Sequence, residues 1–277
     1  MSSNVPKGPL GRLARRVARE SGDEGALRAE PRGATSFLAS AMDLRGSVDV
    51  ARALGPAVPS PAPASKREEA EALRARMRAR ITTVGRGVST TRVAGLPGVP
   101  TFTPVTVLAT LRAAEAIEER EGRAVVRATR MLWAPVAAAI ARRAARAQTE
   151  LDTSFTEEAA ALAALGGRAA YAIALDALLD RVTDGAIAPL LDRPGELLAR
   201  RFERILGREL LALPADPRAE DLASWTGQGG WIEQHLSRSE SYLRGLVEHR
   251  VRRALALVDA CCAVESVEKI DPGEGDT

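Results

Sequence analysis

Apolar residues recur every three or four positions along most of the chain after residue 104, and proline or glycine interrupts this pattern at intervals. Such spacing places apolar side chains on one face of a helix, whereas strands alternate with a period of two. The stretches that keep helical spacing are residues 104–121, 123–148, 155–165, 168–191, 195–211 and 231–267, and Pro135 is expected to kink the second of them. Because no segment alternates strand with helix, we predict an all-α fold, a bundle of long antiparallel helices.

The region before these helices divides into two parts. Residues 1–54 offer short helical stretches punctuated by glycine and proline, and residues 55–65 form a linker with four prolines among small residues. Proline-rich segments of this kind are extended and separate domains. We therefore expect a small helical N-terminal segment, then this linker. A helical bundle over residues 66–267 and a disordered acidic tail over residues 268–277 would follow.

Residues 84–103 interrupt the helical pattern because they are rich in glycine, proline and β-branched residues. The helix that follows the linker, capped by Ser65, is therefore expected to end before them. A short hairpin would pair residues 82–84 with residues 88–91 across the intervening glycines. An irregular connection of this length inside a compact domain is either functional or mobile.

The chain is nearly neutral although it is rich in arginine. Only three of its 39 basic residues are lysines, so 36 are arginines, and 36 acidic residues leave a net charge of +3. An arginine-rich composition can result from a GC-rich genome as easily as from a surface that binds nucleic acid. The position of each arginine is therefore more informative than the total.

The cysteines and the apolar stretches of the sequence indicate the cellular compartment of the protein. Cys261 and Cys262 are the only cysteines, and adjacent cysteines bridge only with strain, which excludes a disulfide framework and favours a reducing compartment. No apolar stretch follows the basic N-terminus, so we expect no secretory signal. The longest apolar run, residues 131–141, has eleven residues, whereas a membrane span needs about 20. We therefore predict a cytoplasmic protein with no membrane span.

The first twenty residues contain one basic amphipathic stretch. Leu10, Leu13 and Val17 fall at helical spacing. The remaining positions carry four arginines: Arg12, Arg15, Arg16 and Arg19. This pattern fits an arm that binds a membrane surface or nucleic acid. A short frayed helix is the alternative, because two turns bind lipid weakly.

An arginine stripe marks the stretch 123–148. Arg123, Arg127 and Arg130 share one face of a helix there. The opposite face carries four apolar residues: Val125, Leu132, Val136 and Ile140. No acidic residue occurs between residues 123 and 149, so the stripe lacks a local counter-charge, as a site for a phosphate backbone or an acidic partner helix would. The alternatives are a solvated face or pairing with the glutamate-rich residues 116–121.

A nucleic-acid site would draw on two further groups of arginines. The first group is Arg74, Arg76, Arg78 and Arg80, and the second is Arg142, Arg143 and Arg146. In the first group the arginines occupy every second position, which spreads their charge around a helix. This distribution is more typical of a solvated helix end than of one groove-filling edge.

The last helix, over residues 231–267, has two faces unlike a solvated surface. One arc is apolar and contains Leu236, Leu243, Val247, Ala254, Val258 and Cys261. A separate flank gathers Trp231, His235, Tyr242 and His249. Such a helix either lies between two neighbours in its own chain or presents the flank to a partner or to a second copy. Both cysteines are interpreted as small buried hydrophobic residues rather than nucleophiles.

Few residues point to chemistry. Asp176, Asp180 and Asp184 share a helical face, but no histidine or acidic motif on another helix would complete a metal site, and Arg181 lies close enough to relieve their repulsion. The sequence contains no phosphate-binding loop, nucleophile elbow or zinc-ligand pair. We therefore predict no catalytic residue, no metal and no cofactor.

Residues 174–206 carry a resemblance to a known family. The residues that carry it are Leu175-Asp176, Leu178, Leu190-Leu191, Leu197-Leu198 and Arg200-Arg201-Phe202-Glu203. They resemble the C-terminal half of an uncharacterised proteobacterial family, a domain of unknown function, and the similarity in kind extends over about residues 36–260. Members are typically encoded beside MotA/TolQ-like motor stators and OmpA-like peptidoglycan-binding proteins, an arrangement similar to motor-based phage defence. The resemblance implies a cytosolic accessory of a membrane machine and carries no catalytic residue.

Together these patterns predict a non-enzymatic cytosolic adaptor or scaffold that binds another helical protein. The arginine stripe and the flank of the last helix would make the contact, and the same flank would serve a homo-oligomer. The alternative is a nucleic-acid-binding protein that uses the arginine stripe together with the two further groups of arginines.

Overall fold

The computed structural model describes residues 59–60 and 62–264, and within a helix it leaves the side chains of residues 182–191 undescribed. The described chain is helical and contains no strand, and its one isolated bridge joins Ala62 to Val264. The prediction of an all-α fold is therefore confirmed. The expectations for residues 1–54 and for the acidic tail lie outside the described residues.

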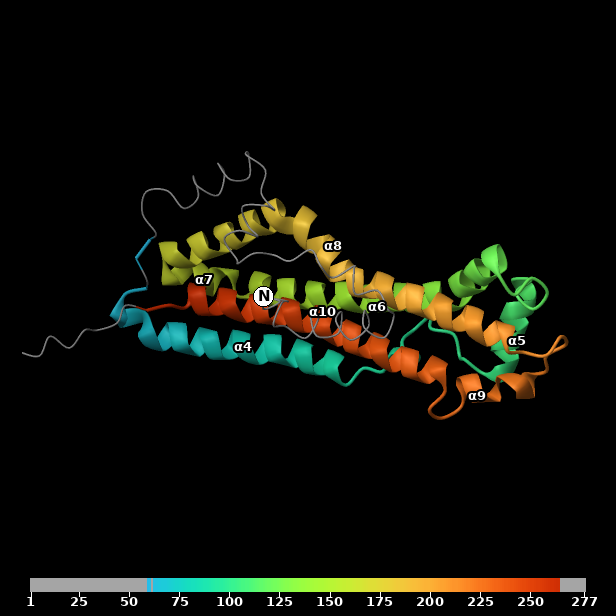
Figure 1. Cartoon of the computed structure of the whole chain (residues 1–277). Helices are drawn as coiled ribbons and strands as arrows, with labels where there is room; N and C mark the ends of the chain where they lie inside the picture. Colours follow the sequence, from blue (N-terminus) through green and yellow to red (C-terminus); the bar gives the residue numbers. More distant parts are fainter. Residues whose placement is uncertain (1–58, 61, 265–277) are drawn as a thin grey trace, which may run out of the picture.

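Four long helices lie side by side and give the described chain an elongated shape (Figure 1). They are α4 (Arg67–Ser89), α6 (Gly122–Glu157), α8 (Gly167–Leu211) and α10 (Trp231–Cys261). Helices α4 and α8 each pack on both α6 and α10. Helices α6 and α10 also contact each other. The chain reverses direction from each long helix to the next (Figure 1).

Short elements close the two ends of this array. The shorter helices are α5 (Pro104–Ala113), α7 (Ala159–Leu165) and α9 (Ala223–Thr226). Three 3-10 turns are η2 (Ala64–Lys66), η3 (Val93–Gly95) and η4 (Ala219–Leu222). The helices α5 and α9 contact η4 at one end, and α7 contacts α8 at the other end.

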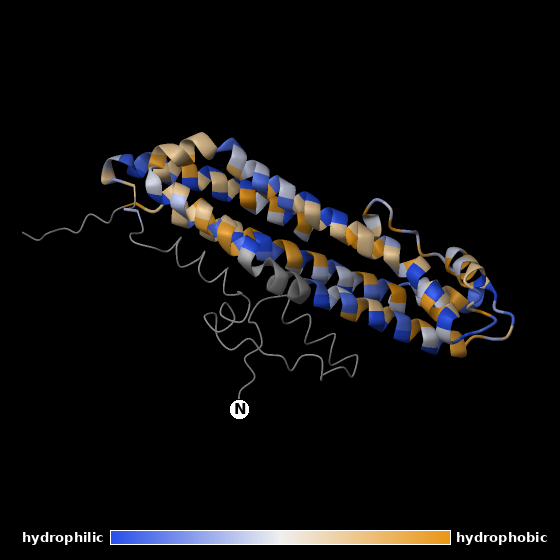
Figure 2. Cartoon of the chain, turned by 90° about the horizontal axis from the view of Figure 1, so that it is seen from above, coloured by the Kyte–Doolittle hydropathy of each residue, from blue (hydrophilic) through white to orange (hydrophobic). Residues whose placement is uncertain are grey.

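The buried side chains form two clusters. The aromatic core lies at the α5 end and includes Trp133, Phe202, Trp225 and Tyr242. The terminal core lies where the described chain begins and ends, and it consists of Ala62, Ala70, Leu73, Met77, Ile81, Leu151, Leu162, Leu165, Ala169, Ala254, Val258, Cys261 and Cys262. Val84 and Val251 pack against both cores. Polar and apolar residues interleave along the long helices (Figure 2), as amphipathic helices that share a core require.

Two expected breaks in the helices are wrong. The helix α4 continues to Ser89, so the hairpin is not formed and the irregular stretch begins at Thr90. A Cβ added at Gly85 would lie 3.3 Å from Val251 Cγ2, so glycine there lets α4 pack closely on α10. The helix α8 likewise continues through Pro194, and a Cβ added at Gly195 would lie 3.1 Å from the Tyr242 ring. Close packing thus overrides the local preference of glycine and proline for turns.

Other helix boundaries differ from the expected ones by several residues. The helix α5 ends at Ala113 rather than at residue 121, and Glu115 and Arg120 then adopt positive φ angles of 59° and 53°. The Arg120 side chain donates hydrogen bonds to the carbonyls of Ile117 and Leu213, at 3.0 and 2.6 Å, which hold this turn. The helix α6 runs through Glu157 instead of ending at residue 148, and α10 ends at Cys261.

Among the described residues, α6 is the one helix long and apolar enough to cross a membrane by length and composition. Half of its most apolar window is buried inside the protein, and the core helix of a soluble protein passes the same test. This observation is weak evidence, so the absence of a membrane span stays a prediction.

Candidate functional site

The arginine stripe lies on the exposed side of the first turns of α6. Arg123, Arg127 and Arg130 are all exposed. The predicted opposite face is buried, with Val125, Leu132, Val136 and Ile140 at most 6% exposed. This separation follows from the helical spacing and confirms the predicted orientation of the helix.

Only one arginine of the stripe has an internal partner. Arg127 Nη1 lies 2.9 Å from Glu115 Oε2, in the turn that follows α5. Among the described residues, neither Arg123 nor Arg130 makes a hydrogen bond or an ion pair. The alternative of pairing with the preceding glutamates therefore holds for Arg127 alone, and two guanidinium groups are left for a ligand or solvent.

A groove adjoins the stripe where the start of α6 meets the end of α8. The groove has a volume of about 740 Å³. It is lined by Arg120, Glu121, Gly122, Arg123, Val125, Val126, Arg200, Glu203, Arg204, Gly207 and Leu211, and we name it the arginine groove. Four arginines and two glutamates make its rim positive, and an acidic ligand would be attracted to it.

The floor and edges of the arginine groove are apolar. Leu211 and Val126 are 58% and 42% exposed, and Met131 on the next turn of α6 is 43% exposed. These three are among the few large apolar side chains that the described structure exposes. Gly207 contributes no side chain, and a Cβ there would only touch Val125 Cγ1 at 3.7 Å. The groove therefore combines exposed apolar surface with positive charge, as protein interfaces do.

The flank of the last helix faces the interior instead of a partner. His235 and Tyr242 are only 1% and 8% exposed, and Trp231 is partly buried, whereas His249 is exposed. The hypothesis that this flank is a docking surface is therefore wrong for His235 and Tyr242. The flank instead makes a second contact within the chain, the alternative that the sequence left open.

Aromatic side chains from two other helices contact His235. The ring of Trp133 from α6 lies 4.8 Å away and the ring of Phe202 from α8 lies 5.1 Å away, both edge to face. Phe202 also contacts Trp231 at 5.1 Å. These rings come from positions far apart in the chain, so the sequence could not predict the cluster. The one signal in the sequence is the small number of aromatic residues, because so few rings are enough for only one aromatic core.

His235 is held in its neutral form. Neither ring nitrogen has a hydrogen-bond partner among the described residues. Burial lowers the pKa of His235 to about 3, and the charges of Arg201 and Arg238 contribute in the same direction. Burial and the neighbouring Arg253 also lower the pKa of His249. His235 thus acts as a buried aromatic group rather than a titrating one near neutral pH.

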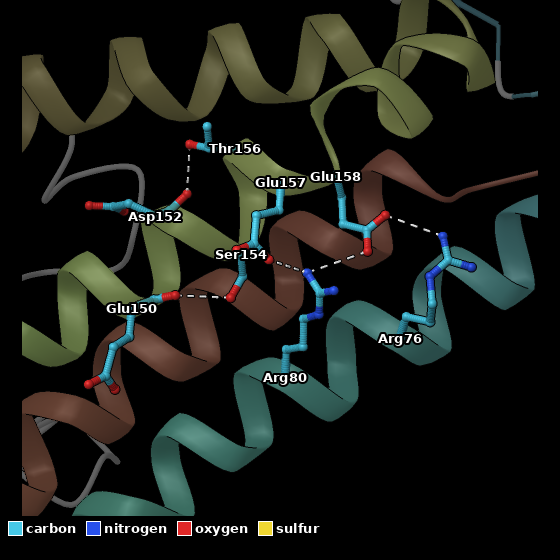
Figure 3. Close-up of polar contacts among 8 residues, drawn as sticks. All are labelled: Arg76, Arg80, Glu150, Asp152, Ser154, Thr156, Glu157 and Glu158. Atoms are coloured by element: carbon cyan, nitrogen blue, oxygen red, sulfur yellow. Dashed lines mark hydrogen bonds and ion pairs between the residues drawn. The ribbon is translucent and has the colours of Figure 1, made fainter.

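The first of the two further arginine groups forms ion pairs between helices. Arg74 and Arg78 contact Asp259 of α10, at 3.5 and 2.8 Å. Arg76 lies 3.2 Å from Glu158, and Arg80 contacts both Glu157 and Glu158 at the junction of α6 and α7 (Figure 3). All four arginines therefore have carboxylate partners inside the chain.

The second group is partly engaged as well. Arg142 donates a hydrogen bond to the Pro97 carbonyl at 3.1 Å, and Arg146 pairs with Glu150 at 3.1 Å. Arg143 is partly buried, and its Nη1 atom has no hydrogen-bond partner in the described structure. A phosphate backbone would have to compete with these internal contacts.

The aspartates of α8 also have an internal partner. Arg253 of α10 lies 2.8 Å from Asp176 and also pairs with Asp180, so an arginine from another helix relieves their repulsion. The Asp184 side chain lies outside the described residues. Within the described part of the chain, no group of three or more histidine, cysteine or acidic residues is arranged to hold a metal ion.

Both cysteines are buried and free, which confirms their interpretation as small core residues. Burial raises the pKa of the Cys261 thiol to about 12 and also raises that of Cys262. The thiolate forms are therefore scarce at neutral pH, and these thiols react slowly.

Comparisons with protein-family models, with curated proteins and with solved structures found no match. The resemblance to the proteobacterial family therefore stays a prediction.

Proposed function

We propose that this protein is a non-enzymatic helical adaptor that binds an acidic amphipathic helix of another protein in the arginine groove. One observation carries the proposal: two arginines without internal partners in the described structure, Arg123 and Arg130, lie on the same surface as exposed apolar side chains. These apolar residues are Val126, Met131 and Leu211. Apolar residues on the partner helix would fill the groove, and its acidic residues would meet the arginines.

The resemblance noted in the sequence gives the partner a concrete candidate. A protein encoded beside MotA/TolQ-like stators would dock on a helical cytosolic part of such a membrane motor, for example in phage defence. The acidic-helix chemistry does not depend on this assignment, so it can be tested without knowing the natural partner.

The nucleic-acid alternative has less support. Apart from the arginine stripe, it relies on arginines that already contact carboxylates, such as Arg76 and Arg80, or a backbone carbonyl, as Arg142 does. Phosphates would have to displace these partners before they could bind.

The experiment measures binding of a labelled synthetic helix with leucines on one face and glutamates on the other. We expect the full chain to bind this helix and R123E/R130E to weaken binding at least about tenfold, since two attractions become repulsions. The matched control is R86E/R92E, which reverses two exposed arginines without side-chain partners in the described structure, away from the groove. The control is expected to bind like the native chain.

Two results would overturn the proposal. One is equal binding by R123E/R130E and by R86E/R92E, because charge in general would then explain the affinity. The other is failure to bind the acidic helix combined with tight, steeply salt-dependent binding of duplex DNA, which would favour the nucleic-acid alternative.

A further inference from the structure

A large cavity separates the middle of α8 from α6 and α10. Figure 1 shows α8 arching away from the other two helices before it returns to the aromatic core. The space beneath the arch has a volume of about 1110 Å³, and we name it the central cavity. It extends along α6 from Trp133 to Phe155, about 33 Å at the rise of a helix.

The walls of the central cavity are largely apolar. The α6 wall consists of Ala137, Ile140, Ala141, Ala144 and Ala145 with larger residues at both ends. Opposite them lie Leu246 and Leu257 of α10 and Ile173 of α8, which is 37% exposed. Ile140, Ala144 and Leu246 are already buried, whereas Ala141, Ala145 and Ile173 stay exposed, and exposed apolar surface is costly to leave in contact with water. A covering segment with apolar side chains at helical spacing would remove that cost.

The rim of the central cavity is acidic. Four aspartates line it, Asp152, Asp176, Asp180 and Asp192, against two arginines, Arg250 and Arg253. Arg253 is shared by Asp176 and Asp180, and Arg250 also donates to the Ala144 carbonyl. Asp152 and Asp192 have no ion-pair partner in the described structure. The occupant should therefore be positively charged as well as amphipathic.

We propose that residues 10–20 of this chain form the helix that occupies the central cavity. Leu10, Leu13 and Val17 supply apolar side chains at positions i, i+3 and i+7 for the alanine wall. Four arginines and Glu20 give this segment a net charge of +3, which complements the aspartates of the rim. The stretch 36–54 also contains apolar residues, but its two arginines are balanced by two aspartates. Charge complementarity thus selects residues 10–20.

The point at which the described chain begins allows this contact. Pro59 lies against Gly167, the first residue of α8, with 3.4 Å between its Cβ and a Cβ added at that glycine. Ile173, six residues further along α8, already lines the cavity. Residues 21–58 provide 38 residues of connection, a reach on the order of 100 Å when extended. The segment can therefore reach either end of the cavity.

Disulfide trapping in the full chain tests the proposal. Leu13→Cys with Ala141→Cys pairs the segment with the cavity wall, whereas Leu13→Cys with Thr90→Cys is the matched control at an exposed position outside the cavity lining. The native cysteines are buried and react slowly. Under mild oxidation in dilute solution, we expect the first pair to form an intrachain disulfide at least fivefold faster than the control. Peptide mapping without reductant identifies it.

Charge reversal distinguishes specific docking from chance collision. In the trapping variant, R15E/R16E should slow the crosslink at least fivefold, and adding D152R/D192R should restore it. Equal rates for the wall and control pairs would overturn the proposal. A disulfide found only between two chains would assign the cavity to a second copy instead, and crosslinking that ignores R15E/R16E would equally contradict the assignment of residues 10–20.

Discussion

The aromatic core and the terminal core stabilise the same four helices by different means. The aromatic core packs large rings from α6, α8, α9 and α10 around a histidine without hydrogen-bond partners. The terminal core packs small and aliphatic side chains, and ion pairs between helices lie at its surface. One end therefore combines ring packing with a neutral histidine, and the other combines aliphatic packing with charge pairs at its surface. Truncation of a ring, a fall in pH and a change in salt concentration should therefore affect the two cores differently.

The largest expected effect is the loss of Phe202. Its ring is 1% exposed and contacts Trp133, Trp231 and His235. We expect Phe202→Ala to lower the free energy of unfolding by about 3–5 kcal/mol, because it leaves a cavity and removes three ring contacts. Denaturant unfolding measures this value. The comparison is Met77→Ala in the terminal core, which should lower the free energy of unfolding by less. A larger loss for Met77→Ala would mean that the aromatic core is not the more tightly packed end.

Acid should weaken the aromatic core before the terminal core. The pKa of His235 is about 3 in the folded chain and about 6.5 when unfolded. Only the unfolded chain binds a proton between these values, so stability is complete above about pH 6.5 and falls as the pH drops towards 3. At about pH 5 the loss is roughly 2 kcal/mol relative to neutral pH.

His235→Leu should remove this part of the pH dependence, since leucine has no proton to gain. His249→Gln is the control, because it removes the exposed histidine of the same helix and leaves His235 in place. Thermal unfolding across this pH range compares the variants with the native chain. An unchanged pH profile in His235→Leu would mean that the native state accommodates the charged imidazole.

The smallest expected effect concerns the ion pairs of the terminal core. Glu158 accepts a hydrogen bond from Arg76, forms an ion pair with Arg80 and is 9% exposed, whereas both arginines are about half exposed (Figure 3). Glu158→Gln should therefore cost about 1 kcal/mol at low salt, and the difference from the native chain should shrink in concentrated salt. Urea unfolding at two salt concentrations measures it. A loss that does not respond to salt would point to packing rather than charge as the role of Glu158.

Local periodicity was enough to predict the helices and the exposed arginine stripe, because both depend on spacing within one segment. It failed at Gly85 and Pro194, where the helix continues because a neighbouring helix packs on it. The position of His235 around its helix correctly predicted a face that is not exposed to solvent. It could not reveal that Trp133 and Phe202, from distant segments, cover that face. The partner of Asp176, 77 positions away at Arg253, was hidden for the same reason.

The continuity of α6 gives the molecule a mechanical property. Its 36 residues run unbroken from Gly122, at the arginine groove, to Glu157, in the ion pairs of the terminal core, a length of about 54 Å. In a straight rod of this length, a tilt of about 5° at one end moves the other by about 5 Å, roughly one helical turn. Pro135 lies inside α6, and its missing backbone N–H makes it a point where the helix bends. A tilt imposed at the arginine groove would therefore pass through Pro135 before it reached the charge pairs at the opposite end of the protein.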